Sequence, residues 1–105
     1  MDMNRDEYCQ ITRFIERIRD KRFLCVECSF EHKDNSILIH SWIVEKFKHE
    51  PCVCNPFFLA LDIADFLQQA PVIKKKYMFS MAYIEPKYKE LNGCSYILTF
   101  NERRS

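Results

Sequence analysis

Two close pairs of cysteines, with a histidine beside the second pair, could together bind a zinc ion. They are Cys25 and Cys28, then His49, Cys52 and Cys54. Zinc prefers four tetrahedral ligands, and thiolate and imidazole bind it well. The spacing C-x2-C followed by H-x2-C-x-C is therefore compatible with a structural zinc site.

The local pattern around the first pair argues against that site. Cys25 and Cys28 lie within residues 23–30, where apolar side chains alternate as they do in a strand. Residues three apart in a strand point to opposite faces, so these two thiols would not share a metal ion. Because free cysteine is a common core residue, we favour buried thiols and expect no cofactor.

The beginning of the sequence and its cysteines favour a reducing compartment. The stretch "MDMNRDEYCQ" is rich in charge and has no apolar segment typical of a secretory signal. Six cysteines in such a chain are expected as free thiols or metal ligands in the cytoplasm or nucleus, whereas a secreted chain would allow three disulfides. No apolar run is long enough to cross a bilayer, so we expect no membrane partner.

Other pairs of potentially reactive residues are not expected to form a catalytic site. His40 precedes Ser41, but neighbouring strand residues face opposite ways and cannot form a nucleophile–base pair. Asp62 and Asp65, one helical turn apart, are better explained as a solvated stripe. Gly93 is the single glycine, so glycine loops that hold phosphates are absent from the sequence. We expect a non-enzymatic protein.

Basic residues in the last third suggest an alternative function in nucleic-acid binding. They are Lys74, Lys75, Lys76, Lys87, Lys89, Arg103 and Arg104. Several tyrosines lie among them, and aromatic rings stack on bases while Lys and Arg contact phosphates. The same basic residues are also explained as charges at a sheet edge, which prevent aggregation between strands. The net charge of the chain is only +1, which is low for a nucleic-acid-binding domain. This alternative, with or without zinc, therefore ranks second.

These residues must be positioned by elements whose periodicity is clear in the sequence. We expect a helix over 6–21, strands over 23–30 and 37–47, a helix over 56–69, and strands over 77–84 and 94–100. Asn55 and Pro56 are the expected N-cap and first residue of the second helix. Residues 1–105 should form one α+β domain in the order α-β-β-α-β-β. Its antiparallel sheet of two hairpins should carry both helices on one face.

The second helix is apolar around most of its circumference, which favours a protein–protein interface. A helix of this kind must be covered on nearly all sides, and one small sheet offers too little surface. The expected interface residues are Trp42, Phe57, Phe58, Phe66 and Leu67. The sequence thus favours a protein-interaction domain that binds a partner and forms homo-oligomers, for example a viral accessory or host-interaction protein.

Overall fold

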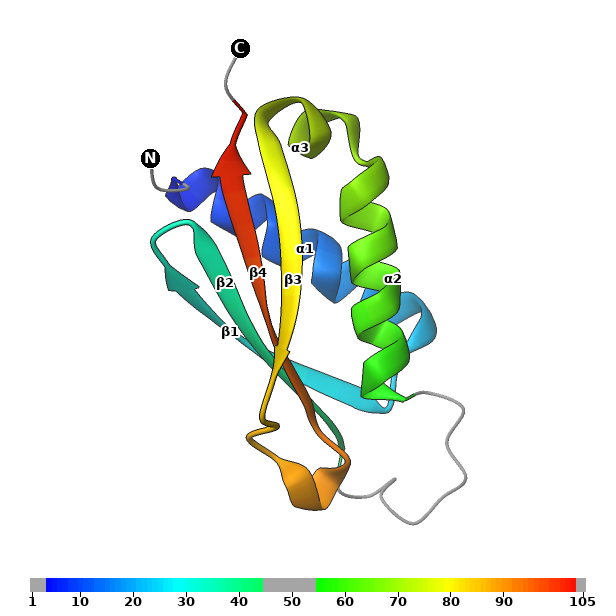
Figure 1. Ribbon diagram of the computed structural model, residues 1–105. Coiled ribbons are helices and arrows are strands. Elements are labelled where there is room, and N and C mark those ends of the chain that lie inside the picture. Colours follow the sequence, from blue (N-terminus) through cyan, green and yellow to red (C-terminus); the bar gives the residue numbers. More distant parts are fainter. Residues whose placement is uncertain (1–3, 45–54, 104–105) are drawn as a thin grey trace.

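A computed structural model describes residues 4–44 and 55–103 of the chain (Figure 1). Its elements are α1 (Arg5–Arg22), β1 (Val26–Lys33), β2 (Ser36–Ile43), α2 (Pro56–Gln69), α3 (Pro71–Lys76), β3 (Tyr77–Ile84), the short 3-10 helix η2 (Lys89–Leu91) and β4 (Cys94–Glu102). This order confirms the predicted α+β fold, to which α3 and η2 are additions.

The four strands form one antiparallel sheet in the order β1-β2-β4-β3. The two predicted hairpins are present, and pairing between β2 and β4 joins them, which leaves β1 and β3 as the edges. The β1–β2 turn lies at Asp34 and Asn35, and Asp34 adopts a positive φ of 51°. Aspartate tolerates this left-handed conformation because its side chain bonds to nearby backbone groups.

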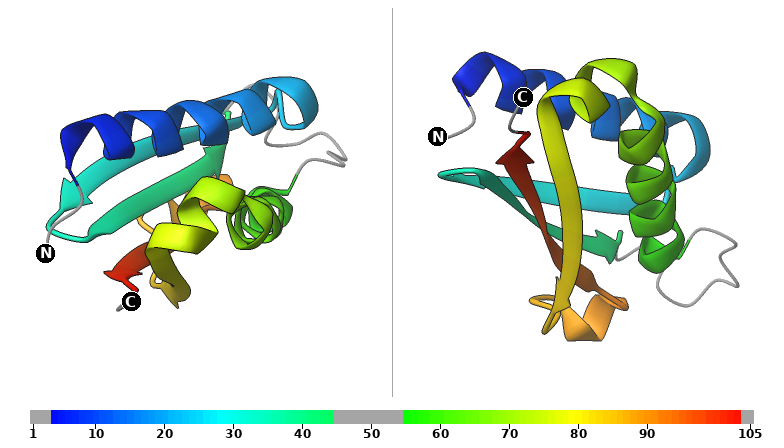
Figure 2. Two further views of the ribbon diagram at one scale, coloured as in Figure 1. Left: turned by 90° about the horizontal axis from the view of Figure 1, so that it is seen from above. Right: turned by 45° about the horizontal axis from the view of Figure 1, so that its top comes forward.

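Both helices pack on the same face of the sheet, as the sequence predicted. Alternate residues of the central strands, such as Ile37, Ile39 and Leu98, are fully buried on this face. They share one core with Ile15 of α1 and Ile63 of α2. Figure 2 shows α1 lying over the first hairpin, while α2 contacts the sheet at β4, β3 and β2. The opposite face of the sheet has no helix over it in the part of the chain that the structure describes.

Local capping explains where the helices begin. Asn4 and Glu7 form a reciprocal capping box at the start of α1, in which each side chain accepts from the backbone N–H of the other residue. Asn55 accepts a hydrogen bond from the N–H of Phe57, and Pro56 is the first residue of α2. The predicted start and end of α2 are both confirmed.

The start of the first strand and the role of Pro71 differ from their predictions for identifiable reasons. The first strand begins at Val26 and not at Phe23, because the Phe23 N–H still bonds to the Arg19 carbonyl and completes α1. Pro71 was expected only to end a helix. It also begins α3, since a proline has no N–H to satisfy at a first helical position. The second strand is described to Ile43, and residues 45–47 of its prediction lie outside the described residues.

Candidate interaction site

An apolar groove of about 460 Å³ lies between α1 and the α2–α3 segment. Its lining residues are Gln10, Ile11 and Phe14 of α1, Phe66, Leu67 and Gln69 of α2, and Ala70, Pro71 and Ile73 around the start of α3. The Phe14 ring lies 5.1 Å from the Phe66 ring, and the Phe14 side chain remains 42% exposed. Two aromatic rings on different helices therefore stay accessible within a mostly apolar depression.

A basic hollow of about 520 Å³ adjoins this groove and shares Gln69 and Pro71 with it. Its charged residues are Lys74, Lys75 and Arg103. Arg103 is fixed against α3, since its Nε donates to the Lys74 carbonyl at 2.6 Å and its backbone N donates to the Lys76 carbonyl at 2.8 Å. An apolar surface and a basic surface thus meet at the junction between α2 and α3.

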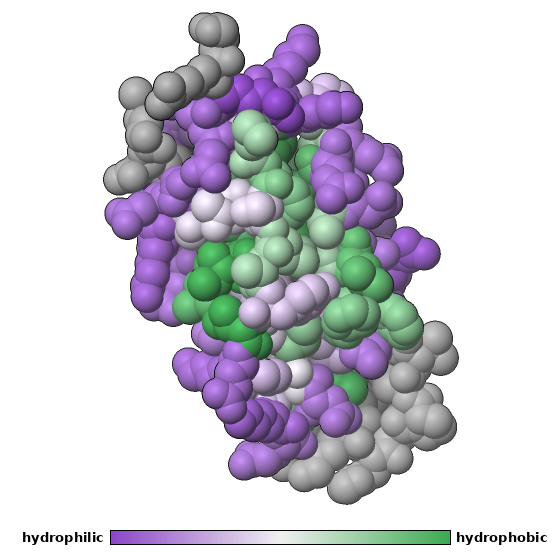
Figure 3. All heavy atoms as spheres, in the orientation of Figure 1, coloured by the Kyte–Doolittle hydropathy of each residue, from purple (hydrophilic) through white to green (hydrophobic). Residues whose placement is uncertain are grey.

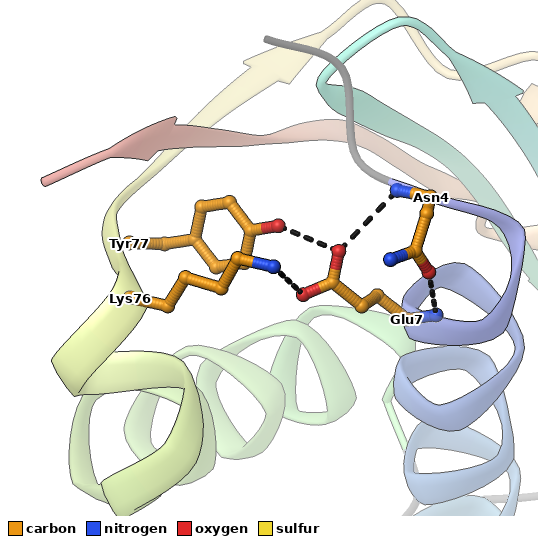
Figure 4. Close-up of polar contacts among 4 residues, drawn as sticks. All are labelled: Asn4, Glu7, Lys76 and Tyr77. Atoms are coloured by element: carbon orange, nitrogen blue, oxygen red, sulfur yellow. Dashed lines mark hydrogen bonds and ion pairs between the residues drawn. The ribbon is translucent and has the colours of Figure 1, made fainter.

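Lys76 differs from its two neighbours because it belongs to a polar cluster that joins α1 to the start of β3 (Figure 4). Its Nζ lies 2.8 Å from Glu7 Oε2, and the Tyr77 hydroxyl donates to Glu7 Oε1 at 2.7 Å. Burial raises the pKa of Glu7, but hydrogen bonds from Lys76, Tyr77 and the Asn4 backbone outweigh it and hold the pKa below its usual value. The positive charge of Lys76 is therefore balanced within the domain.

The structure divides the basic residues predicted for nucleic acid into separate groups. Lys74, Lys75 and Arg103 lie together at α3, whereas Lys87 and Lys89 lie in the β3–β4 connection at the far end of β3 (Figure 1). Lys89 is also ion-paired with Glu85. Arg104 lies outside the described residues. The predicted set therefore does not form one continuous basic surface.

The five residues predicted for an interface also lie in different places. Phe66 lines the groove, and Leu67, with 2% of its side chain exposed, is a core residue. Phe57 and Phe58 are 44% and 52% exposed at the start of α2. Trp42 is half-buried on the face of the sheet opposite the helices, where its ring lies 4.4 Å from Tyr88.

The most informative groove residue that the sequence analysis did not select is Phe14. The signal for it was present, since Phe14 is an aromatic residue just outside the apolar stripe of the first helix. A lone exposed aromatic residue is common on protein surfaces. Its significance therefore depends on the neighbouring Phe66, which only the packing of α1 against α2 reveals.

The cysteines do not come together as a metal site within the described ranges. No group of three His, Cys, Asp or Glu side chains there is arranged to hold a metal ion. His49, Cys52 and Cys54 lie outside those ranges, so the zinc hypothesis stays a prediction. Cys28 is a free thiol, and burial raises its pKa to about 12. Cys25 is disulfide-bonded, which corrects the expectation of a free thiol or metal ligand at this position.

A serine–histidine contact occurs where the sequence did not place one. His40 Nδ1 lies 2.7 Å from Ser95 Oγ, which also accepts from the Lys87 N–H at 3.2 Å. Burial and then the Lys87 charge lower the pKa of His40. Ser95 is 1% exposed, so its hydroxyl is not accessible to a substrate. The contact instead fastens the β3–β4 connection to the sheet.

The face of the sheet opposite the helices has a mixed apolar and polar character. Leu38 and Ile97 are partly exposed there, and Met78 is 58% exposed. Figure 3 looks onto this face and shows hydrophobic residues gathered across its middle. Such a surface is a candidate for contact with another polypeptide.

Comparison with known proteins gives no relative of this chain. No protein-family model, no curated protein and no solved structure matches it. Among the helices of residues 4–44 and 55–103, none has the length and apolar character to cross a bilayer.

Proposed function

We propose that this protein is a non-enzymatic interaction domain that binds a segment of another protein in the groove between α1 and α2. The observation that supports this proposal is the continuity of the groove with the basic hollow at α3. Apolar surface provides binding free energy when it leaves water, and fixed charges select the partner. The two features occur side by side on the same part of the molecule.

The chemistry of this surface specifies its partner. Phe14 and Phe66 offer rings that an aromatic or branched aliphatic side chain covers, and such anchors dominate the free energy of binding at interfaces. Lys74, Lys75 and Arg103 attract carboxylates, and the Arg103 guanidinium is suited to bidentate contacts with them. The proposed ligand is therefore a segment with an apolar anchor followed or preceded by Asp or Glu.

Selection from a library of random displayed peptides on the full chain tests this proposal. The enriched peptides should combine a large apolar residue with acidic residues a few positions away. Fluorescence anisotropy with one enriched peptide should show at least tenfold weaker binding to Phe14→Ala. Phe58→Ala removes the same ring from an exposed site outside the groove lining, and it should bind as the unchanged protein does.

Charge reversal at α3 sharpens the same experiment. Lys74→Glu/Lys75→Glu should weaken binding of the acidic peptide and reduce its dependence on salt, because the attraction between exposed opposite charges is screened by ions. Enriched peptides without apolar anchors, or peptide binding that Phe14→Ala leaves unchanged, would remove the groove from the proposal.

Nucleic-acid binding is a second candidate, favoured by the grouping of Lys74, Lys75 and Arg103 at α3. In this case, Lys74→Glu/Lys75→Glu should abolish salt-sensitive retention on heparin and binding of a labelled oligonucleotide. Phe14→Ala should then have no effect, since an apolar groove makes no phosphate contact. Unchanged retention of the charge-reversed protein would eliminate this candidate.

A further inference from the structure

The edge strand β3 has no residue that protects it from pairing with another strand. Its eight residues, Tyr77–Ile84, include no charge, no proline and no glycine. One side of β3 pairs with β4, and within residues 4–44 and 55–103 no other strand pairs with its second side. Exposed edges without charges are templates for strand addition.

The hydrogen bonds to β4 determine which backbone groups of β3 point outward. Arg103 N donates to the Lys76 carbonyl, so Lys76 and Arg103 are a hydrogen-bonded pair. Tyr77 and Glu102, the next pair along the two strands, are therefore a non-hydrogen-bonded pair. The pattern then alternates along the strand. Met78, Ser80, Ala82 and Ile84 bond to β4, while Phe79, Met81 and Tyr83 direct their N–H and C=O groups away from it.

An independent contact agrees with this assignment. Tyr77 should also direct its N–H away from β4, and that N–H bonds to the Ile73 carbonyl at the end of α3. The next three outward residues, Phe79, Met81 and Tyr83, have no such bond to a described residue. The free edge therefore presents an evenly spaced row of donors and acceptors, with Met81 at its centre.

We propose that β3 pairs antiparallel with β3 of a second copy of this chain, about a two-fold axis at Met81. In this register Phe79 lies opposite Tyr83 of the second copy, and Met81 lies opposite Met81. Each of these pairs exchanges two hydrogen bonds, because all the residues involved direct both backbone groups outward. A two-fold interface requires a surface that is complementary to itself, and this row of donors and acceptors meets that requirement.

The side chains along the edge also suit a second copy. On the open face Ser80 comes opposite Ala82 of the second copy, and both are small, uncharged and exposed. Phe57 of α2 packs on Tyr83 with ring centres 5.5 Å apart, and Phe58 and Leu61 nearby remain 52% and 44% exposed. The unpartnered part of α2 thus adjoins the free edge (Figure 1). This interface does not use the groove.

Sedimentation velocity over a wide concentration range tests the proposal. The unchanged protein should form a dimer of the 12.7 kDa chain. Ser80→Lys/Ala82→Lys places lysine opposite lysine and should weaken the dimer at least tenfold, as should Ser80→Glu/Ala82→Glu. Mixing these two variants should restore a dimer, because opposite charges then face each other.

A matched control uses the other edge of the sheet. Glu27→Lys in β1 adds the same two units of positive charge as Ser80→Lys/Ala82→Lys, at an exposed position, and should leave the dimer intact. A protein that stays monomeric throughout, or a dimer that Ser80→Lys/Ala82→Lys leaves unchanged, would overturn the proposal. A dimer that dissociates only with Phe58→Asp would place the contact on α2. Binding of the selected peptide should persist in the β3 variants, so the two proposals fail separately.

Discussion

The two edges of one sheet differ in how they resist pairing with other strands. β1 has Glu27, Glu31 and Lys33 on the face away from the helices, whereas β3 has Met78, Ser80, Ala82 and Ile84 in the corresponding places. Arg19 also donates to the Val26 carbonyl at 3.1 Å and so engages the start of β1. Charges on an edge strand discourage strand addition, and β3 lacks them.

This difference has a consequence for assembly. A sheet with two open edges adds copies at both sides and grows into a fibre, while a sheet with one blocked edge stops at a pair. Charged residues on β1 and uncharged residues on β3 therefore suit a closed dimer. The protected edge therefore limits the size of an assembly, as does the edge that pairs.

Removing the two carboxylates from β1 should have the largest effect on assembly. Glu27→Val/Glu31→Val replaces both carboxylates on the open face of β1 with apolar residues that are well suited to strands, so both edges would then accept another copy. We expect the dimer to give way to open polymers, visible as a large rise in light scattering. A variant that remains a dimer at every concentration would show that these carboxylates do not protect the edge.

The same substitutions in a chain with a blocked β3 provide the control. Combined with Ser80→Lys/Ala82→Lys, they leave β1 as the one edge able to pair. We expect that protein to stop at dimers and to scatter little light. Polymers in the combined variant would mean that the association uses exposed apolar surface in general and not the strand edges.

The extent to which the sequence predicts this fold depends on how local the signals are. α2 and β3 have the predicted bounds because a proline start and a strict alternation of side chains are properties of a few neighbouring residues. α3 was missed since Pro71 can end one helix or begin another, and nearby sequence does not distinguish these roles.

The candidate sites were harder to predict because they depend on contacts between distant elements. The groove requires Phe14 and Phe66 to meet across two helices, although they lie far apart in the sequence. The free edge of β3 requires knowing which residues bond to β4. Alternation of side chains shows which face each residue occupies, but it does not show to which neighbour its backbone groups point.

The protected edge strand β1 also carries Cys28 on its helix-facing side, where the reactivity of the thiol reports how readily this edge opens. Burial raises the pKa of this thiol from 9.0 to about 12, which lowers the thiolate fraction near pH 8 roughly a thousandfold. We expect Cys28 to react far more slowly with a maleimide or disulfide reagent in the folded protein than in urea. Mass spectrometry of the labelled peptides identifies the site. Equal labelling rates in buffer and in urea would mean that Cys28 is accessible in the folded protein, and therefore that β1 opens readily.

The polar cluster of Glu7, Lys76 and Tyr77 at the start of β3 should contribute moderately to stability. Glu7→Gln weakens its interactions with Lys76 and Tyr77, and we expect the free energy of unfolding at pH 7 to fall by about 1 kcal/mol. Urea unfolding measures this change. Glu16→Gln, at an exposed position of the same helix, should change stability by less than about 0.5 kcal/mol.

The effect of Glu7 should also depend on pH in a defined direction. Because the folded state lowers the pKa of Glu7, its stabilising contribution is full above the ordinary value of 4.5. The contribution is lost as the pH falls through the lowered folded-state pKa. The unchanged protein and Glu7→Gln should therefore approach equal stability in acid. A difference that stays constant across this range would show that the carboxylate charge is not involved.

The smallest expected effect concerns Tyr96, which lies on β4 between the two edges of the sheet. Its hydroxyl is fully buried and has no hydrogen-bond partner among the described residues. An unsatisfied buried polar group costs free energy, so Tyr96→Phe should keep or raise stability, by up to about 1 kcal/mol. Tyr77→Phe removes the same group where it donates to Glu7, and should lower stability by about 1 kcal/mol. If urea unfolding shows equal losses of stability for both variants, the Tyr96 hydroxyl has a hydrogen-bond partner in solution. Its burial then does not destabilise the fold.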